Sequence, residues 1–207
     1  MRSARGEVVT LYPAFLKLDG LPVVIVGGGP VAAGKLAGLL DAGAIVTVVA
    51  PSIVGELRVP SVKLIESEFR PAHLAGARWV VAAATPEVNR DVARAAAERG
   101  LFVNAVDDTA SATAYLGGVV RRGPVELAIS TGGLAPALAG LLREALDAIL
   151  PHDLEKWIVV ATAARHEWKR TGVPMAQRRP LLLRALDRIY ASPLKSDAPT
   201  ESNRSVV

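Results

Sequence analysis

The stretch VVIVGGGPVAAGK, residues 23–35, decides the fold of this 207-residue chain. Its four β-branched residues, 23–26, predict a buried strand, and the alanine-rich segment after the three glycines predicts a helix. Read as G-x-G-x-x-A, the motif consists of Gly27, Gly29 and Ala32. The first glycine permits a tight turn, the second lets the backbone approach a pyrophosphate, and the small third residue permits close packing. The motif predicts a dinucleotide site at a helix N-terminus; the alternative is a glycine turn that only packs a helix.

Strand and helix signals alternate through the first hundred residues, which predicts a parallel sheet with crossover helices. The expected strands are residues 23–26, 45–49, 62–66, 79–83 and 101–106. The expected helical segments are residues 30–42, 71–75 and 86–99. These short apolar runs suit strands that are buried on both faces. The sequence therefore predicts an α/β fold with a Rossmann-like domain over residues 1–113.

The pattern changes after Asp107. Two strands are expected at residues 115–120 and 125–130, joined by Arg121-Arg122-Gly123-Pro124. A helix is expected at residues 136–150, and its apolar stripe consists of Leu138, Leu141, Leu142, Leu146 and Ile149. Region 114–150 is too small for a core of its own and should pack on the sheet domain or on a partner subunit. Two helices at 154–170 and 174–191 predict a helical C-terminal domain, residues 151–191, before a disordered polar tail, 192–207.

Composition narrows the class of protein. Hydrophobic residues make up 51% and charged residues 21%, as in a folded soluble chain, and the absence of cysteine excludes disulfides. There is no run of 18 apolar residues, so no membrane span and a cytoplasmic location are expected. The net charge of +4 suits a polyanionic small molecule, or only reflects solvated arginines. With 4% aromatic residues, the chain lacks the stacking platforms typical of nucleic-acid binding.

Ligands of a doubly wound sheet bind beyond the carboxyl ends of its strands. That rule selects the glycine loop, Ala50-Pro51-Ser52, Ala84-Thr85 and residues 104–108. Asp107 follows the last strand, where a carboxylate can act as a general base beside a nicotinamide ring. The alternative is that Asp107 caps a turn with Asp108 and Thr109.

The second strand ends without the acidic residue that usually binds the ribose hydroxyls. The place is held by Ala50-Pro51-Ser52, and no arginine adjoins it for a 2′-phosphate. The motif therefore leaves NAD and NADP open, and the Ser52 hydroxyl and backbone N–H groups are the available substitutes.

Other polar positions have two interpretations each. Ser130-Thr131-Gly132-Gly133 precedes a helix, so it is either an anion site or a helix cap. Arg121, Arg122 and Arg143 either bind carboxylates or are solvated. The three histidines are scattered, so no resident metal site is expected.

Taken in order, several segments resemble the precorrin-2 dehydrogenase family, which includes stand-alone enzymes and the amino-terminal part of siroheme synthase. They are LYPAFLKLDGLPVVIVGGGPVAAGK, GAIVTVVAPS, AAATPEVN, VNAVDD and AISTGGLAPALAGLLRE, and they span about residues 8–150. The resemblance implies NAD-dependent oxidation of precorrin-2 to sirohydrochlorin. It also implies an intertwined homodimer in which region 114–150 is the dimerisation region. Many members then insert iron, so Fe²⁺ or Co²⁺ as a chelation substrate stays open.

The resemblance also implies roles for residues. It places NAD contacts at Pro30, Val31, Pro51 and Ser52. Together with the glycine loop and the strand ends, the expected cofactor site is Gly27, Gly28, Gly29, Pro30, Val31, Pro51, Ser52, Thr85 and Asn104. It makes Asp107 the catalytic aspartate. The expected tetrapyrrole site is Arg121, Arg122, Ser130, Thr131, Gly132, Gly133 and Arg143. Thr131 replaces a serine that is phosphorylated in some relatives, which leaves such regulation open.

Two other functions are weighed against this one. A regulatory module that senses NAD without catalysis would need no base at Asp107 but would need a segment that binds an effector. A dehydrogenase for another small acid would share the glycine loop.

Overall fold

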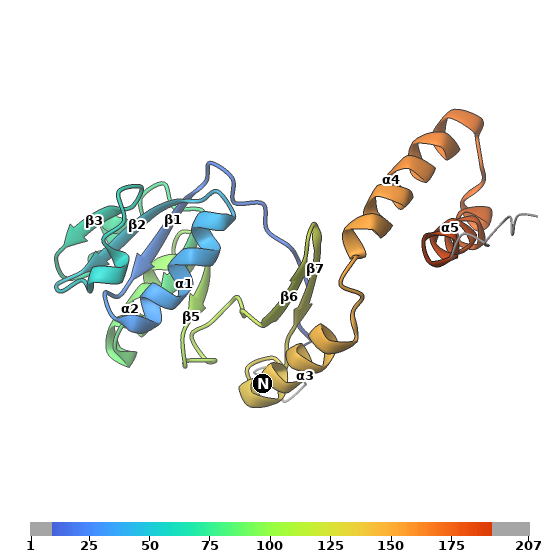
Figure 1. Cartoon of the computed structure of the whole chain (residues 1–207). Coiled ribbons are helices and arrows are strands. Elements are labelled where there is room, and N and C mark those ends of the chain that lie inside the picture. The colour runs from blue at the N-terminus through green and yellow to red at the C-terminus, as the bar shows by residue number, and fades with distance from the viewer. Residues whose placement is uncertain (1–9, 192–207) are drawn as a thin grey trace, which may run out of the picture. The chain divides into compact units, whose positions relative to one another are not determined.

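The computed structural model describes residues 10–191 (Figure 1). These residues form two compact units. The first contains the described residues up to Gly118 together with Ile129–Leu142, and the second contains Val119–Ala128 and the described residues from Arg143 onward. The tail predicted to be disordered, residues 192–207, lies outside the described residues.

A five-stranded parallel sheet forms the centre of the first unit. Its strands are β1 (Pro22–Val26), β2 (Ile45–Ala50), β3 (Lys63–Glu66), β4 (Trp79–Ala82) and β5 (Phe102–Ala105). Their spatial order is β3-β2-β1-β4-β5. The chain steps outward from β1 in one direction to β3 and in the other direction through β4 to β5. The switch point, where ligands of such sheets bind, therefore lies between β1 and β4.

Helices cover both faces of this sheet. Alternate residues of a strand point to opposite faces, so Val23 and Ile25 join one apolar cluster while Val24 and Val26 join the other. Helix α1 (Pro30–Asp41) packs on the first cluster through Leu36, and α2 (Pro86–Ala97) packs on the second. Short 3₁₀ turns, η1 (Gly55–Leu57) and η2 (Pro71–Leu74), connect the remaining strands. The predicted Rossmann-like α/β domain is confirmed.

The hairpin after the sheet differs from its prediction. Strand β6 (Gly118–Arg122) begins three residues late and includes both arginines, so only Gly123-Pro124 separate it from β7 (Val125–Ile129). The late start has a physical cause. The backbone N–H groups of Thr113 and Ala114 both donate to the Val103 carbonyl, so this part of the chain is held against β5.

Three helices follow: α3 (Pro136–Ile149), α4 (Leu154–Thr171) and α5 (Met175–Tyr190). Helix α4 ends at Gly172, whose φ of 70° is left-handed and favours glycine. The Trp157 indole N–H donates to the Tyr190 hydroxyl (2.6 Å), which donates to Asp153 (2.8 Å), so the start of α4 is joined to the end of α5. No helix within residues 10–191 is long and apolar enough to cross a membrane.

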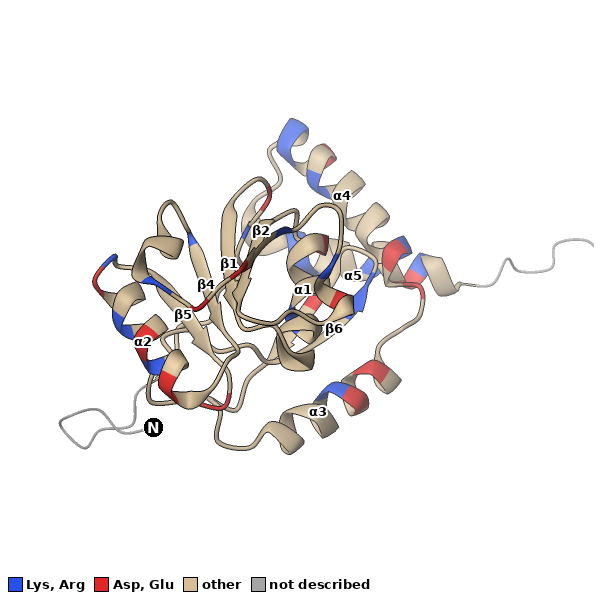
Figure 2. Cartoon of the chain, turned by 90° about the vertical axis from the view of Figure 1, so that its left-hand side faces the viewer, with Lys and Arg blue, Asp and Glu red and all other residues tan. Residues whose placement is uncertain are grey.

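Positive charge gathers on the α4–α5 pair (Figure 2). Residues 151–191 contain eight Lys and Arg against four Asp and Glu, a formal charge of +4. That equals the net charge of the whole chain, so the sheet unit is close to neutral.

Candidate functional site

The glycine loop between β1 and α1 has no room for a side chain at its first position. Gly27 has a φ of +131°, and a Cβ built there would lie 2.2 Å from the Ala83 carbonyl oxygen. Its backbone N–H donates to the Val49 carbonyl (2.9 Å). Gly27 therefore lies between the carboxyl ends of β2 and β4, at the switch point of the sheet, and only glycine fits there.

Gly28 brings the loop after β2 against the glycine loop. A Cβ on Gly28 would lie 1.9 Å from the Ser52 carbonyl oxygen and 2.8 Å from the Ala50 Cβ. The Gly28 carbonyl also accepts a hydrogen bond from the Val54 N–H (2.9 Å). The structure therefore places Pro51-Ser52 beside the glycine loop, as a shared cofactor site requires.

Gly29 faces open space. A Cβ built on Gly29 would meet no atom within 4 Å, and its φ of −95° is accessible to any residue. Neither packing nor backbone conformation therefore requires glycine at this position. Gly29 is the N-cap of α1, no side chain caps this end, and the following Pro30 has no N–H. The free N–H groups of the first helical turn and the helix dipole both favour an anion here. An open, uncapped helix start next to two tightly packed glycines fits the pyrophosphate of a dinucleotide.

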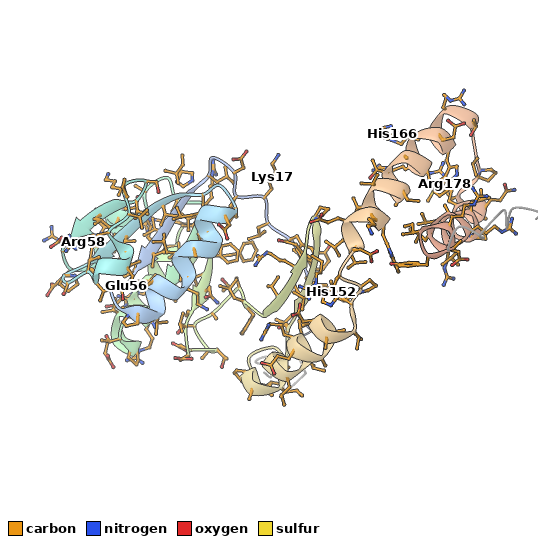
Figure 3. The ribbon with its side chains drawn as sticks, viewed as in Figure 1. Lys17, Glu56, Arg58, His152, His166 and Arg178 are labelled. Carbon is orange, nitrogen blue, oxygen red and sulfur yellow. The ribbon has the colours of Figure 1, made fainter. Side chains whose placement is uncertain are left out.

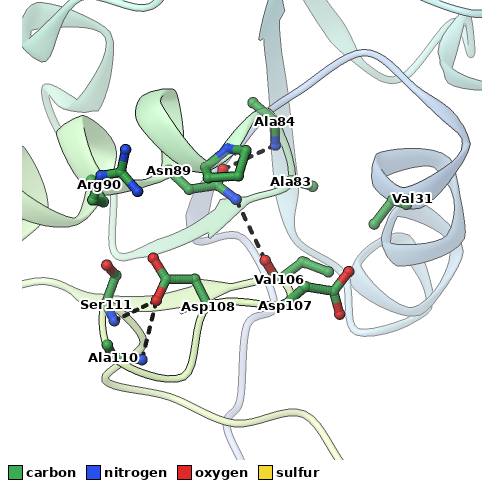
Figure 4. Close-up of a pocket in the computed structure, with 11 residues that line it drawn as sticks. Val31, Ala83, Ala84, Asn89, Arg90, Val106, Asp107, Asp108, Ala110 and Ser111 are labelled. Carbon is green, nitrogen blue, oxygen red and sulfur yellow. Dashed lines mark hydrogen bonds between the residues drawn. The ribbon is translucent and has the colours of Figure 1, made fainter.

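A cleft of about 440 Å³ adjoins this loop at the carboxyl ends of β4 and β5 (Figure 4). Val31 of α1 lines one side, the start of α2 lines another, and residues 106–111 close it. Val31 therefore belongs to the first turn of α1, next to the glycine loop, and also lines the cleft.

Asp107 and Asp108 differ sharply although they are neighbours in this cleft. The Asp108 carboxylate accepts hydrogen bonds from the backbone N–H groups of Ala110 and Ser111, both at 3.1 Å. Hydrogen bonds from Ser111, first through its hydroxyl and then through its N–H, lower the pKa of Asp108. Asp108, not Asp107, therefore caps the turn.

Within residues 10–191 the Asp107 carboxylate has no hydrogen-bond or ion-pair partner, and it is exposed. Figure 4 shows it pointing away from Asp108, on the side of the cleft where Val31 lies. Its φ of 57° makes it the one described non-glycine residue in the left-handed region, a conformation that costs about 1–2 kcal/mol. An unpaired carboxylate held by a strained backbone is suited to accept a proton from a ligand.

Asn89 was missed by the sequence analysis, yet it fixes the geometry of the cleft. Its side chain is 3% exposed. Its amide oxygen accepts from the Ala84 N–H (3.0 Å), and its amide nitrogen donates to the Val106 carbonyl (3.5 Å). It thereby joins the ends of β4 and β5 directly before Asp107. A signal was present, because Asn89 falls on the apolar stripe of α2 with Val92 and Ala96.

Two predicted cofactor residues have structural partners. Asn104 is 7% exposed, and its amide nitrogen donates to the Ala114 carbonyl (3.0 Å), which fixes the returning end of the Asp107 loop. Thr85 is the N-cap of α2. The Glu87 backbone N–H and then the Thr85 hydroxyl lower the pKa of the Glu87 carboxyl. Their contact with a cofactor stays a prediction.

The Ser130–Gly133 turn lies against the loop that carries Asp107. A Cβ on Gly133, whose φ is +77°, would lie 2.6 Å from the Thr109 Cγ2. Both hydroxyls serve the turn: Ser130 Oγ accepts from the Gly132 N–H (3.1 Å), and Thr131 Oγ1 accepts from the Ala135 N–H (3.2 Å). The structure thus brings this predicted substrate segment close in space to the Asp107 loop.

The three predicted substrate arginines belong to the second unit and have acidic partners there. Arg121 pairs with Glu126 (2.7 Å), Arg122 with Asp147 (2.8 Å) and Arg143 with Glu144 (3.2 Å). Their contact with a substrate stays a prediction.

Histidines do not gather with other metal ligands. His152 precedes α4 and His166 lies near its far end (Figure 3). In the described part of the chain, no group of three or more His, Cys, Asp or Glu side chains could hold a metal ion.

Comparison with known proteins gives concordant results. A family profile described as "Putative NAD(P)-binding" matches residues 14–118. The chain is 43% identical to siroheme synthase 1 of Aeromonas salmonicida (strain A449) over 173 residues, which are 81% of this chain and 37% of that protein. It is 33% identical to siroheme synthase of Neisseria meningitidis serogroup C (strain 053442) over 200 residues, 94% of this chain and 42% of that protein. The chain therefore spans well under half the length of these relatives.

A solved structure, "SirC, precorrin-2 dehydrogenase", is similar over most of both chains. It matches with a TM-score of 0.70 and 25% identity, covering 87% of this chain and 92% of that one. The likeness therefore extends beyond the sheet domain into the helical part.

Proposed function

Because the chain belongs to the precorrin-2 dehydrogenase family, we propose that it oxidises precorrin-2 to sirohydrochlorin with NAD, in siroheme biosynthesis. The observation that carries the proposal is the unpaired Asp107 carboxylate in a cleft that begins at the glycine loop. A base and a dinucleotide site thus adjoin, as the removal of one hydride and one proton from a substrate requires.

The glycine loop holds the cofactor in this proposal. The open backbone at Gly29 and the first turn of α1 receive the pyrophosphate, and the Pro51-Ser52 loop borders the part beyond β2. NAD supplies the nicotinamide ring that accepts the hydride. Val31, between the loop and the cleft, borders the space between cofactor and substrate.

Asp107 accepts the proton that balances the loss of hydride. Two of the polar groups around it already have partners: Asp108 caps the turn, and Asn89 holds the carbonyl of Val106. The Asp107 carboxylate therefore stays free to face the substrate, and the strain in its backbone is offset by the hydrogen bonds of its neighbours.

Assembly as a homodimer through region 114–150 belongs to the same proposal. Helix α3 exposes a row of apolar side chains: Leu138 is 49% exposed, Leu141 64% and Ile149 74%. Such a row supports docking against a second copy. Arg121, Arg122 and Arg143 then serve the carboxylates of the substrate, and the protein acts in the cytoplasm.

An anaerobic assay tests the proposal. The protein is mixed with precorrin-2 and NAD, and sirohydrochlorin is followed by its absorbance. Asp107→Asn should abolish turnover and leave NAD affinity unchanged. The matched control is Asp108→Asn, which keeps an oxygen acceptor for Ala110 and Ser111 and should retain most of the activity. Binding of NAD by the wild-type protein without turnover would instead favour the regulatory module.

A further inference from the structure

The cleft has little positive charge for a substrate that carries many carboxylates, as precorrin-2 does. Asp107 and Asp108 both line it, and the lowered pKa of Asp108 keeps that carboxyl ionised. The positive charge of the chain lies mainly on α4 and α5 rather than on the sheet unit. Precorrin-2 carries eight carboxylates, so a cleft lined by the carboxylates of Asp107 and Asp108 would repel it unless a cation were present.

Arg90 is the one cation among the described residues that line the cleft. It lies in the second turn of α2, on the same side of the cleft as Asp108 and Ser111 (Figure 4). Its neighbour Asn89 is fixed to the ends of β4 and β5 by two hydrogen bonds. The position from which the Arg90 side chain extends is therefore set relative to Asp107.

The Arg90 guanidinium remains available to a ligand. Its Nη2 donates to the Glu87 carboxylate at 3.3 Å, and the side chains of Arg90 and Glu87 are both more than half exposed. Exposed pairs of this kind contribute little, so a substrate carboxylate can replace Glu87. The planar guanidinium has five N–H donors and suits bidentate binding of a carboxylate.

We propose that Arg90 binds one acetate or propionate carboxylate of the tetrapyrrole and so determines which edge of the macrocycle faces Asp107. This inference rests on the proposed function. It assigns the role to a residue that neither the glycine motif nor the family's segments single out.

The experiment compares Arg90→Gln with Arg94→Gln. Arg94 lies one turn later on α2 and forms the same kind of i,i+3 pair, with Asp91 at 2.9 Å, but it does not line the cleft. Both variants lose one charge from the same helix. Arg90→Gln should raise the KM for precorrin-2 roughly tenfold to a hundredfold, the range for a hydrogen bond to a charged group. Its NAD affinity should match that of the wild type.

Direct binding of sirohydrochlorin, followed by absorbance in an anaerobic titration, gives a readout independent of turnover. Arg90→Gln should weaken it by a similar factor, Arg90→Lys should restore part of it, and added salt should shrink the difference. Equal behaviour of Arg90→Gln and Arg94→Gln would overturn the role of Arg90 and leave the proposed function standing. A wild-type protein that binds NAD but neither converts precorrin-2 nor binds sirohydrochlorin would overturn both.

Discussion

A glycine in this loop can leave room for a bound pyrophosphate, or it can permit close packing within the fold, and Gly29→Ala tests which role Gly29 has. Gly28 and Gly29 are adjacent, but a Cβ on Gly28 would collide with the Ser52 carbonyl at 1.9 Å, whereas a Cβ on Gly29 would meet nothing within 4 Å. If the open space at Gly29 receives a pyrophosphate, alanine there should harm binding and leave folding intact. Alanine at Gly28 should harm folding.

The expected change in stability at Gly29 is small. Its φ of −95° and ψ of −175° suit alanine, so the lower entropy of the unfolded chain contributes about 0.4–1 kcal/mol of stabilisation. Alanine is a poorer N-cap than glycine by a similar amount, on the order of 1 kcal/mol. The two effects offset each other, so Tm should move by no more than about 3 °C.

Gly28→Ala should instead destabilise by about 1–3 kcal/mol, because the colliding Ser52 atom is backbone and the loop must shift. At roughly 2–4 °C per kcal/mol for a chain of this size, the fall in Tm is easily measured. Thermal unfolding by circular dichroism gives both values.

Binding of NAD supplies the decisive comparison. Gly29→Ala should raise the Kd at least about tenfold, equivalent to about 1.4 kcal/mol, in calorimetric titration. If Gly29→Ala binds NAD as the wild type does, the reasoning is refuted and the loop is only a packing turn.

Three further predictions concern the cleft. Asp107→Gly should raise the free energy of unfolding by about 1 kcal/mol in urea, because glycine accepts the left-handed backbone. The same variant should lose turnover. A lower free energy of unfolding would contradict the backbone strain at Asp107. The folded pKa of Asp108 is depressed, so its stabilisation is present above the ordinary pKa of 3.8 and is lost as pH falls through the lower folded value. Asp108→Asn should therefore flatten the acid side of the stability profile, and an unchanged profile would argue against these hydrogen bonds. If the chain also inserts metal, Co²⁺ added to sirohydrochlorin should give a faster absorbance change with wild-type protein than with Asp107→Asn, and equal rates would exclude a chelatase role for Asp107.

The sheet and the glycine loop could be predicted because local patterns determine them. Buried parallel strands need continuous apolar runs, and the tight turn at Gly27 needs glycine. The first strand of the hairpin was predicted to begin three residues too early, because the N–H groups of Thr113 and Ala114 donate to the Val103 carbonyl across the fold, and no local pattern carries that information. The second strand begins at Val125, as predicted. The 3₁₀ turn η1 was not anticipated either.

The location of the site could be predicted from the sequence, but the separate roles of Asp107, Asp108 and Asn89 could not. Asp107 and Asp108 are alike in sequence, and only the hydrogen bonds from Ala110 and Ser111 show which one caps the turn. Asn89 looked like an ordinary helix residue, because its two partners, Ala84 and Val106, come from different strand ends. Both distinctions depend on contacts between segments that meet only in the folded chain.

The contact between Gly28 and the loop after β2 constrains how this protein can change over evolution. The atom that approaches Gly28 is the backbone oxygen of Ser52, so the side chain at that position is free to vary. The path of the loop is not free, because the Val54 N–H must still reach the Gly28 carbonyl. Insertions and deletions between Ala50 and Gly55 should therefore be rejected where substitutions are accepted. Selection there acts on the length of the chain more than on its chemistry.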